Sequence, residues 1–110
     1  MNASTTIQAD RYATAIENAL WDGHKPSAFD WQVLLVFRTG KTRLYQFPKS
    51  YSLDTVIKRG QHWGSWDKAV AFLIRDTAGR VLYQGPVTNA LGHALEPDWM
   101  NAVALAGEGA

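Results

Sequence analysis

Hydrophobic and polar residues alternate most clearly between residues 31 and 38. Trp31, Val33, Leu35 and Phe37 share one side of that segment. A period of two is typical of a β-strand. Gly40 supplies a turn, and residues 42–47 return as a second strand. The turn can span two to four residues, so the face of the sheet that carries Arg43 and Tyr45 stays open.

A second hairpin is indicated further along the chain. Residues 69–74 are apolar throughout, which favours a central strand covered on both faces. The Asp76-x-x-Gly79 pattern suits a turn that glycine completes in the left-handed region, and residues 80–84 return. A helix over residues 66–77 is the competing interpretation, but β-branched and aromatic residues in this segment favour a strand.

Two helical patterns flank these hairpins. Residues 6–21 repeat apolar positions at helical spacing and predict a helix laid on the sheet, and a last helix begins at Pro97 and runs to Gly107. The segment between residue 87 and residue 96 is expected to be irregular or weakly helical. The predicted fold is therefore α+β: one domain over residues 1–110, with a four-stranded antiparallel sheet made from two β-hairpins in the order α-ββ-α-ββ-α. Residues 1–5 and 107–110 are expected to be loose termini.

A short helix is predicted between the two hairpins, over residues 52–60. Ser52 can cap its start, and Gly60 is the expected stop. Lys58 and Arg59 then fall in its last turn, where basic side chains favour the helix dipole. Residues 60–68 follow as a polar loop in which Gly64-Ser65 forms a turn.

Five tryptophans in 110 residues are the least ordinary part of the composition. Trp21, Trp31 and Trp99 fall on apolar faces and are expected in the core. Trp63 and Trp66 fall in the polar loop instead, where large rings either fold back on the core as a lid or are displayed as contact anchors.

The charge is unevenly distributed along the chain. The net charge is only +1 with a pI near 8.1, below the strongly basic range of typical nucleic-acid-binding domains. Residues 38–68 nevertheless carry seven basic side chains against two acidic ones. That central block forms one positive face if folding gathers it, or a solvated strand edge if it does not.

Several kinds of chemistry have no support in this sequence. The absence of cysteine excludes disulfides, thiol catalysis and cysteine-ligated metals. His24, His62 and His93 are far apart without metal-ligand spacing, so no metal, no cofactor and no catalytic residue is predicted. No basic leader and no membrane-length apolar run occurs, so a cytoplasmic location without membrane contact is expected.

Three functions remain as hypotheses. The first is a small non-enzymatic protein-binding module or inhibitor, of the size and motif poverty typical of phage or mobile-element accessory proteins. The second is a nucleic-acid-binding protein with a basic, tryptophan-containing surface. The third is a small enzyme with His62 as general base, supported by Ser65, Asp67 or Tyr45, although no nucleophile elbow is present. The partner-binding residues predicted for the first hypothesis are Lys41, Arg43, Lys58, Arg59, His62, Trp63 and Trp66.

Overall fold

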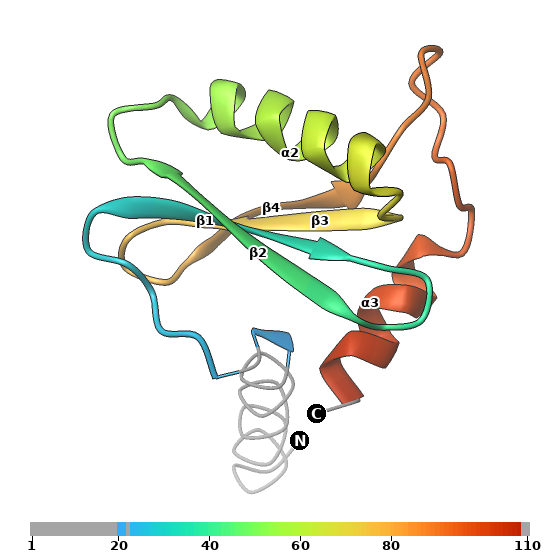
Figure 1. The fold of residues 1–110 in the computed structure, drawn as a ribbon, viewed down its shortest axis with the longest axis horizontal. Coiled ribbons are helices and arrows are strands. Elements are labelled where there is room, and N and C mark those ends of the chain that lie inside the picture. The colour runs from blue at the N-terminus through green and yellow to red at the C-terminus, as the bar shows by residue number, and fades with distance from the viewer. Residues whose placement is uncertain (1–19, 22, 109–110) are drawn as a thin grey trace, which may run out of the picture.

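Four antiparallel strands form one sheet in the order β2-β1-β3-β4 (Figure 1). The strands are β1 (Asp30–Val36), β2 (Thr42–Pro48), β3 (Ala71–Arg75) and β4 (Val81–Pro86). Each predicted hairpin is present, and the pairing of β1 with β3 joins the two hairpins at the centre of the sheet. The predicted α+β fold class, with its four-stranded antiparallel sheet, is thus confirmed.

The computed structural model describes residues 20–21 and 23–108. The helix predicted over residues 6–21 therefore lies outside the described residues, apart from Leu20 and Trp21. Both of these side chains are buried.

The sheet is covered on both faces. Figure 1 shows α2 (Leu53–Asp67) on one face and α3 (Trp99–Glu108) on the other. The core on the α2 side contains Val33, Leu35, Val56, Ala69, Phe72, Ile74 and Val87. The core on the α3 side contains Leu20, Trp21, Leu34, Val36, Val70, Ala71, Leu73, Ala102 and Ala106.

The unbroken apolar run at residues 69–74 has the position that its pattern predicts. All five residues of β3 are buried, and β3 pairs with β1 on one side and β4 on the other. The alternative helix over residues 66–77 is wrong, because residues 71–75 form the ladders of a central strand.

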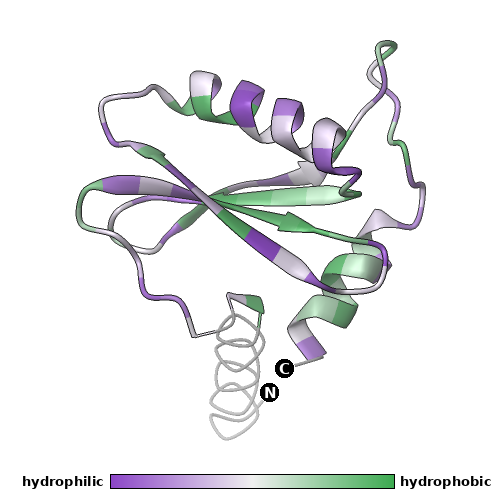
Figure 2. Cartoon of the chain, viewed as in Figure 1, coloured by the Kyte–Doolittle hydropathy of each residue, from purple (hydrophilic) through white to green (hydrophobic). Residues whose placement is uncertain are grey.

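Hydropathy follows this layered arrangement. Figure 2 shows hydrophobic residues along most of β3 and much of α3. Hydrophobic and hydrophilic residues alternate along α2 and β2. Within the described residues, no helix is long and apolar enough to cross a membrane.

The register of the first hairpin settles which side chains face α2. Gly40 has φ +87°, as its place in the turn predicts. Leu35 pairs with Arg43 and Val33 pairs with Tyr45. Because paired residues point to the same face of a sheet, Arg43 and Tyr45 lie on the face that α2 covers.

The second hairpin turns at Gly79, whose φ of +85° confirms the predicted left-handed glycine. The Asp76 carboxylate accepts the backbone N–H groups of Ala78 and Arg80, each at 2.9 Å. The pairing shifts by one residue after Ile74, which leaves Leu82 as an extra residue in β4. Such an irregularity makes an edge strand a poorer template for pairing with another chain.

Residues 52–68, called here the central stretch, differ most from expectation. Residues 52–60 do not form a short helix followed by a loop, because α2 continues to Asp67, with Ser52 as its N-cap as predicted. Gly60 is not a stop and Gly64 is not a turn residue. A Cβ atom at Gly60 would lie 2.5 Å from the Phe72 ring, and one at Gly64 would lie 2.7 Å from Val87 Cγ2. Glycine is therefore needed where the helix backbone approaches the sheet.

The helix ends at Asp67, and its C-cap is Lys68 and not a glycine. Lys68 has φ +64°, and its N–H bonds to the carbonyl groups of Gly64 and Ser65. Lys58 and Arg59, expected in the last turn, lie in the middle of α2 instead.

The segment after β4 is largely irregular, as expected, and a single isolated bridge closes it into a small projecting hairpin. Thr88 pairs with Ala94 in an antiparallel bridge, and Asn89 N–H donates to the His93 carbonyl at 2.8 Å. The Gln61 side chain fixes the base of this hairpin to α2 through three hydrogen bonds to Thr88. Figure 1 shows it standing beside the C-terminal end of α2. The last helix, α3, reaches Glu108, which lies two residues inside the segment expected to be loose.

Candidate partner-binding site

Helix α2 has one buried face and one exposed face. Val56, Gly60 and Gly64 recur every four residues and are the buried positions of the helix. The exposed side, called here the outward face of α2, consists of Asp54, Lys58, Arg59, His62, Ser65 and Trp66. Four of the seven predicted partner-binding residues are in that set.

Trp63 is folded back onto the protein. It packs against the core on the α2 side and stacks on Tyr45, with ring centroids 5.4 Å apart and an interplanar angle of 16°. The His62 and Trp63 rings make a T-shaped contact, with centroids 5.1 Å apart and an interplanar angle of 81°. For Trp63, the lid hypothesis therefore describes the geometry better than display does.

Trp66 has the opposite environment. Its residue surface is 74% exposed, and within the described residues its indole neither stacks on another ring nor donates a hydrogen bond. Of the two tryptophans of the central stretch, Trp63 therefore acts as a lid on the core and Trp66 is displayed at the surface.

Asp67 ties the end of α2 to β2. Its carboxylate accepts the Tyr45 hydroxyl at 2.6 Å and an Arg43 guanidinium N–H at 3.1 Å. The Tyr45 hydrogen bond, helped by Arg43, lowers the pKa of Asp67 below its ordinary value, whereas the same bond raises the pKa of Tyr45. The side chain of Asp67 is only 11% exposed, so this contact is partly shielded from water. Arg43 is accordingly paired with Asp67 while more than half of its side chain stays exposed.

Basic side chains gather beyond this contact, in a depression of about 490 Å³ between the first hairpin and the end of α2. Phe37, Arg38, Thr39, Lys41, Thr42, Arg43 and Lys68 line it, and we call it the basic depression. The structure thus brings the predicted residues Lys41 and Arg43 together. Lys58 and Arg59 do not line it.

Lys68 is the residue of the basic depression that sequence analysis missed. It was expected to be part of a loop, and its place beside Arg43 depends on α2 continuing to Asp67. The available signal was the four-residue spacing of Val56, Gly60 and Gly64, which extends the helix by two turns.

The geometry around His62 bears on the enzyme hypothesis. His62 is exposed, and its contact with a side chain in the described structure is the ring edge on Trp63. The Tyr45 hydroxyl and the Asp67 carboxylate bond each other and do not orient His62. Across residues 20–21 and 23–108, no group of three or more metal-ligating side chains occurs.

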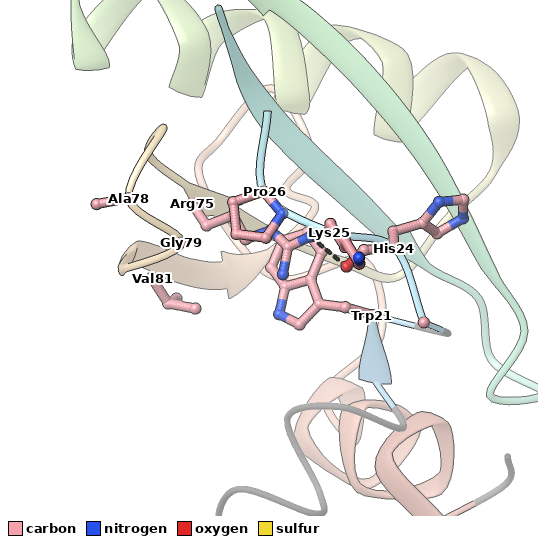
Figure 3. Close-up of a pocket in the computed structure, with 9 residues that line it drawn as sticks. Trp21, His24, Lys25, Pro26, Arg75, Ala78, Gly79 and Val81 are labelled. Atoms are coloured by element: carbon pink, nitrogen blue, oxygen red, sulfur yellow. Dashed lines mark hydrogen bonds between the residues drawn. The ribbon is translucent and has the colours of Figure 1, made fainter. Parts of the chain in front are cut away.

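A second cationic site lies on the α3 side of the sheet (Figure 3). Arg75 is 6% exposed and borders a pocket of about 340 Å³. Its guanidinium carbon lies 4.0 Å from the centre of the Trp21 ring, and its nitrogens donate to Gln32 Oε1 at 2.6 Å and to the His24 carbonyl at 2.7 Å. A buried charge with these contacts stabilises the position of the segment before β1.

Sequence analysis did not find the Arg75 site. Its partners Trp21, His24 and Gln32 are 43 to 54 residues away in the chain, and no spacing rule links them. The alternation of residues 31–38 placed Gln32 on the sheet face opposite Trp31 and gave no sign of its partner.

Comparisons with protein-family models, with curated proteins and with solved structures found no match to this chain. The functional argument therefore depends on the surface itself.

Proposed function

We propose that this protein is a small binding module for another protein, of the kind that acts as an inhibitor or accessory factor. Its contact surface is the outward face of α2, with Trp66 as the central anchor. The observation that carries the proposal is the 74% exposure of Trp66 on a helix whose other face is fixed against the sheet.

Exposure on a rigid element distinguishes Trp66 from a ring on a loop tip. The backbone of α2 approaches Phe72 and Val87 so closely that a Cβ atom would clash at Gly60 or Gly64. The helix therefore holds the backbone of Trp66 in one position, and little backbone entropy is lost when a partner covers the ring. Tryptophan is also among the residues that most often dominate binding energy at protein interfaces.

The neighbours of Trp66 fit a polar rim around that anchor. Arg59 and His62 lie seven and four residues before it on the outward face of α2, and both are exposed. An apolar centre with a polar, hydrated rim is the usual arrangement of a protein interface.

The proposal is tested by capture from a nuclease-treated lysate of the native host, followed by reconstitution with the purified captured protein. Trp66→Ala should weaken the complex by about 30-fold, the effect expected of a hot-spot residue. The control is Phe29→Ala, which removes an equally exposed ring (74%) next to the start of β1, at the other end of the sheet.

Equal affinity of Trp66→Ala and the unchanged protein for the same partner would contradict the proposal. Thermal unfolding of each variant accompanies the measurement, so that a loss of binding is compared at equal stability.

A second candidate, a single-stranded nucleic acid, is favoured by the position of Trp66 two residues before Lys68 in the basic depression. A ring beside cations can stack a base while the cations contact phosphates. A complex that survives nuclease treatment and changes little with salt would exclude this candidate.

A further inference from the structure

Cations from three segments of the chain converge on the basic depression. Arg38 and Lys41 flank the turn of the first hairpin, Arg43 lies on β2, and Lys68 follows α2. The positions are brought together by folding, since Lys68 is 25 residues beyond Arg43. Phe37 adds an apolar side chain to the wall of the depression.

Two of these four cations already have acidic partners. Arg38 is 2.6 Å from Glu96, and Arg43 is 3.1 Å from Asp67. In the described part of the chain, neither Lys41 nor Lys68 has an acidic side chain within 4.0 Å. The basic depression therefore carries two positive charges in excess of its acidic neighbours.

Lys68 is an unusual residue for its position. Glycine is the common residue where a helix ends in the left-handed region, and Lys68 is the one non-glycine residue with a positive φ among the described residues. A backbone held in a disfavoured region often marks a functional position. The side chain that glycine would lack is the one that lines the depression beside Arg43.

We propose that the basic depression binds the carboxylate side chains of an acidic segment of the partner protein, with Lys41 and Lys68 as the contacting residues. This inference rests on the proposed function and names the chemistry of the partner. Arg38 and Arg43 keep their own acidic neighbours and add positive potential to the depression.

An acidic protein segment fits this surface better than a nucleic acid does. The two lysines of the basic depression that have no acidic partner lie together in one place, whereas a nucleic-acid strand needs cations spaced along its phosphates. The chain as a whole carries a net charge of only +1, so the attraction is local.

The test uses fluorescein-labelled decaglutamate as the probe, with binding followed by fluorescence anisotropy at low ionic strength. The variant Lys41→Gln/Lys68→Gly should weaken binding about tenfold, because it removes two exposed charge contacts. Glycine is chosen at position 68 because it suits the left-handed backbone, so the fold is retained. Thermal unfolding checks that the variant is no less stable than the original.

The matched control is Lys25→Gln/Lys49→Gln, which removes the same charge from two exposed lysines outside the depression. It should bind decaglutamate nearly as well as the original protein. Equal weakening in the two double variants, or no weakening in either, would overturn the proposal. Chemical-shift changes at the Lys41 and Lys68 amides should accompany binding.

A labelled twenty-residue oligothymidylate distinguishes the two classes of anion. If it binds more tightly than decaglutamate and depends on the same lysines, the acidic-protein assignment is overturned. Trp66→Ala should leave decaglutamate binding unchanged, since the probe has no apolar side chain. Failure of this inference therefore shows in the lysine variants, while failure of the proposed function shows in Trp66→Ala.

Discussion

The two faces of α2 have opposite composition for physical reasons. The buried face has two glycines and one valine, Gly60, Gly64 and Val56, because the helix backbone lies almost in contact with Phe72 and Val87. The outward face carries an aspartate, two cations, a histidine, a serine and an indole that is 74% exposed. One face shows what close packing requires, whereas on the other the described ring contact is that of His62 with Trp63. The comparison teaches that the residues of the central stretch must be sorted by helical face before any function is assigned to them.

The largest effect is expected from filling the space at Gly60. Gly60→Val should destabilise the protein by about 3 kcal/mol, because its Cβ atom would overlap the buried Phe72 ring, which stacks on Tyr83. The control Ser65→Val places the same side chain on the outward face and should change the free energy of unfolding by less than about 0.5 kcal/mol. Urea denaturation measures both. Equal stability of the two variants would mean that the faces do not differ as described.

The strands could be predicted from the sequence because burial imposes a simple pattern on them. Alternation at residues 31–38 and an apolar run at residues 69–74 identify a strand of each hairpin, and Gly40 and Gly79 lie at their turns. These features depend on neighbours in the chain. Beyond the two hairpins, the strand order β2-β1-β3-β4 requires one further pairing, that of β1 with β3, which are the two most apolar strands.

The extent of α2 could not be predicted in the same way, because glycine has two opposite meanings. At Gly60 it was interpreted as a helix stop, the common meaning of glycine after basic residues. Its actual role is to allow close approach to Phe72, a residue of another element. The true end of the helix is at Asp67, and its C-cap Lys68 has the backbone conformation that normally indicates glycine. Because the end of the helix is not predicted, the sequence does not place Lys68 beside Lys41 and Arg43 in the basic depression.

A smaller effect is expected from the two tryptophans. Trp63→Ala should cost about 2 kcal/mol, because the half-buried ring packs on the core and stacks on Tyr45. Trp66→Ala should change stability by less than about 0.5 kcal/mol, since its ring is exposed. Thermal and urea unfolding of the pair measure the difference. A destabilisation by Trp66→Ala as large as that by Trp63→Ala would show that both rings stabilise the fold.

The smallest effect is expected from removing the hydrogen bond between the Tyr45 hydroxyl on β2 and the Asp67 carboxylate at the end of α2. Tyr45→Phe keeps the ring that stacks on Trp63 and removes only the hydroxyl that Asp67 accepts at 2.6 Å. This hydrogen bond is the largest cause of the lowered pKa of Asp67. The variant should therefore be less stable at neutral pH, and the pKa of Asp67 should rise toward its ordinary value of 3.8.

The sign of the pH dependence follows from linkage. Because the folded pKa of Asp67 lies below the unfolded value, its contribution to stability is present above that unfolded value and is lost as pH falls through the folded one. The stability difference between Tyr45→Phe and the original protein should thus be greatest near neutral pH and shrink in acid. Asp76, whose pKa is lowered chiefly by the Arg80 backbone N–H, adds a similar acid loss to both proteins.

Urea denaturation from about pH 2 to about pH 7 measures this difference, with Tyr51→Phe as the control. Tyr51 has a hydroxyl with no hydrogen bond among the described residues, so its removal should give a difference that does not vary with pH. If the Tyr45→Phe difference is as independent of pH as the control, Asp67 does not hold the end of α2 to β2 through its charge. The orientation of α2 would then depend on its packing against the sheet and on the Gln61–Thr88 hydrogen bonds.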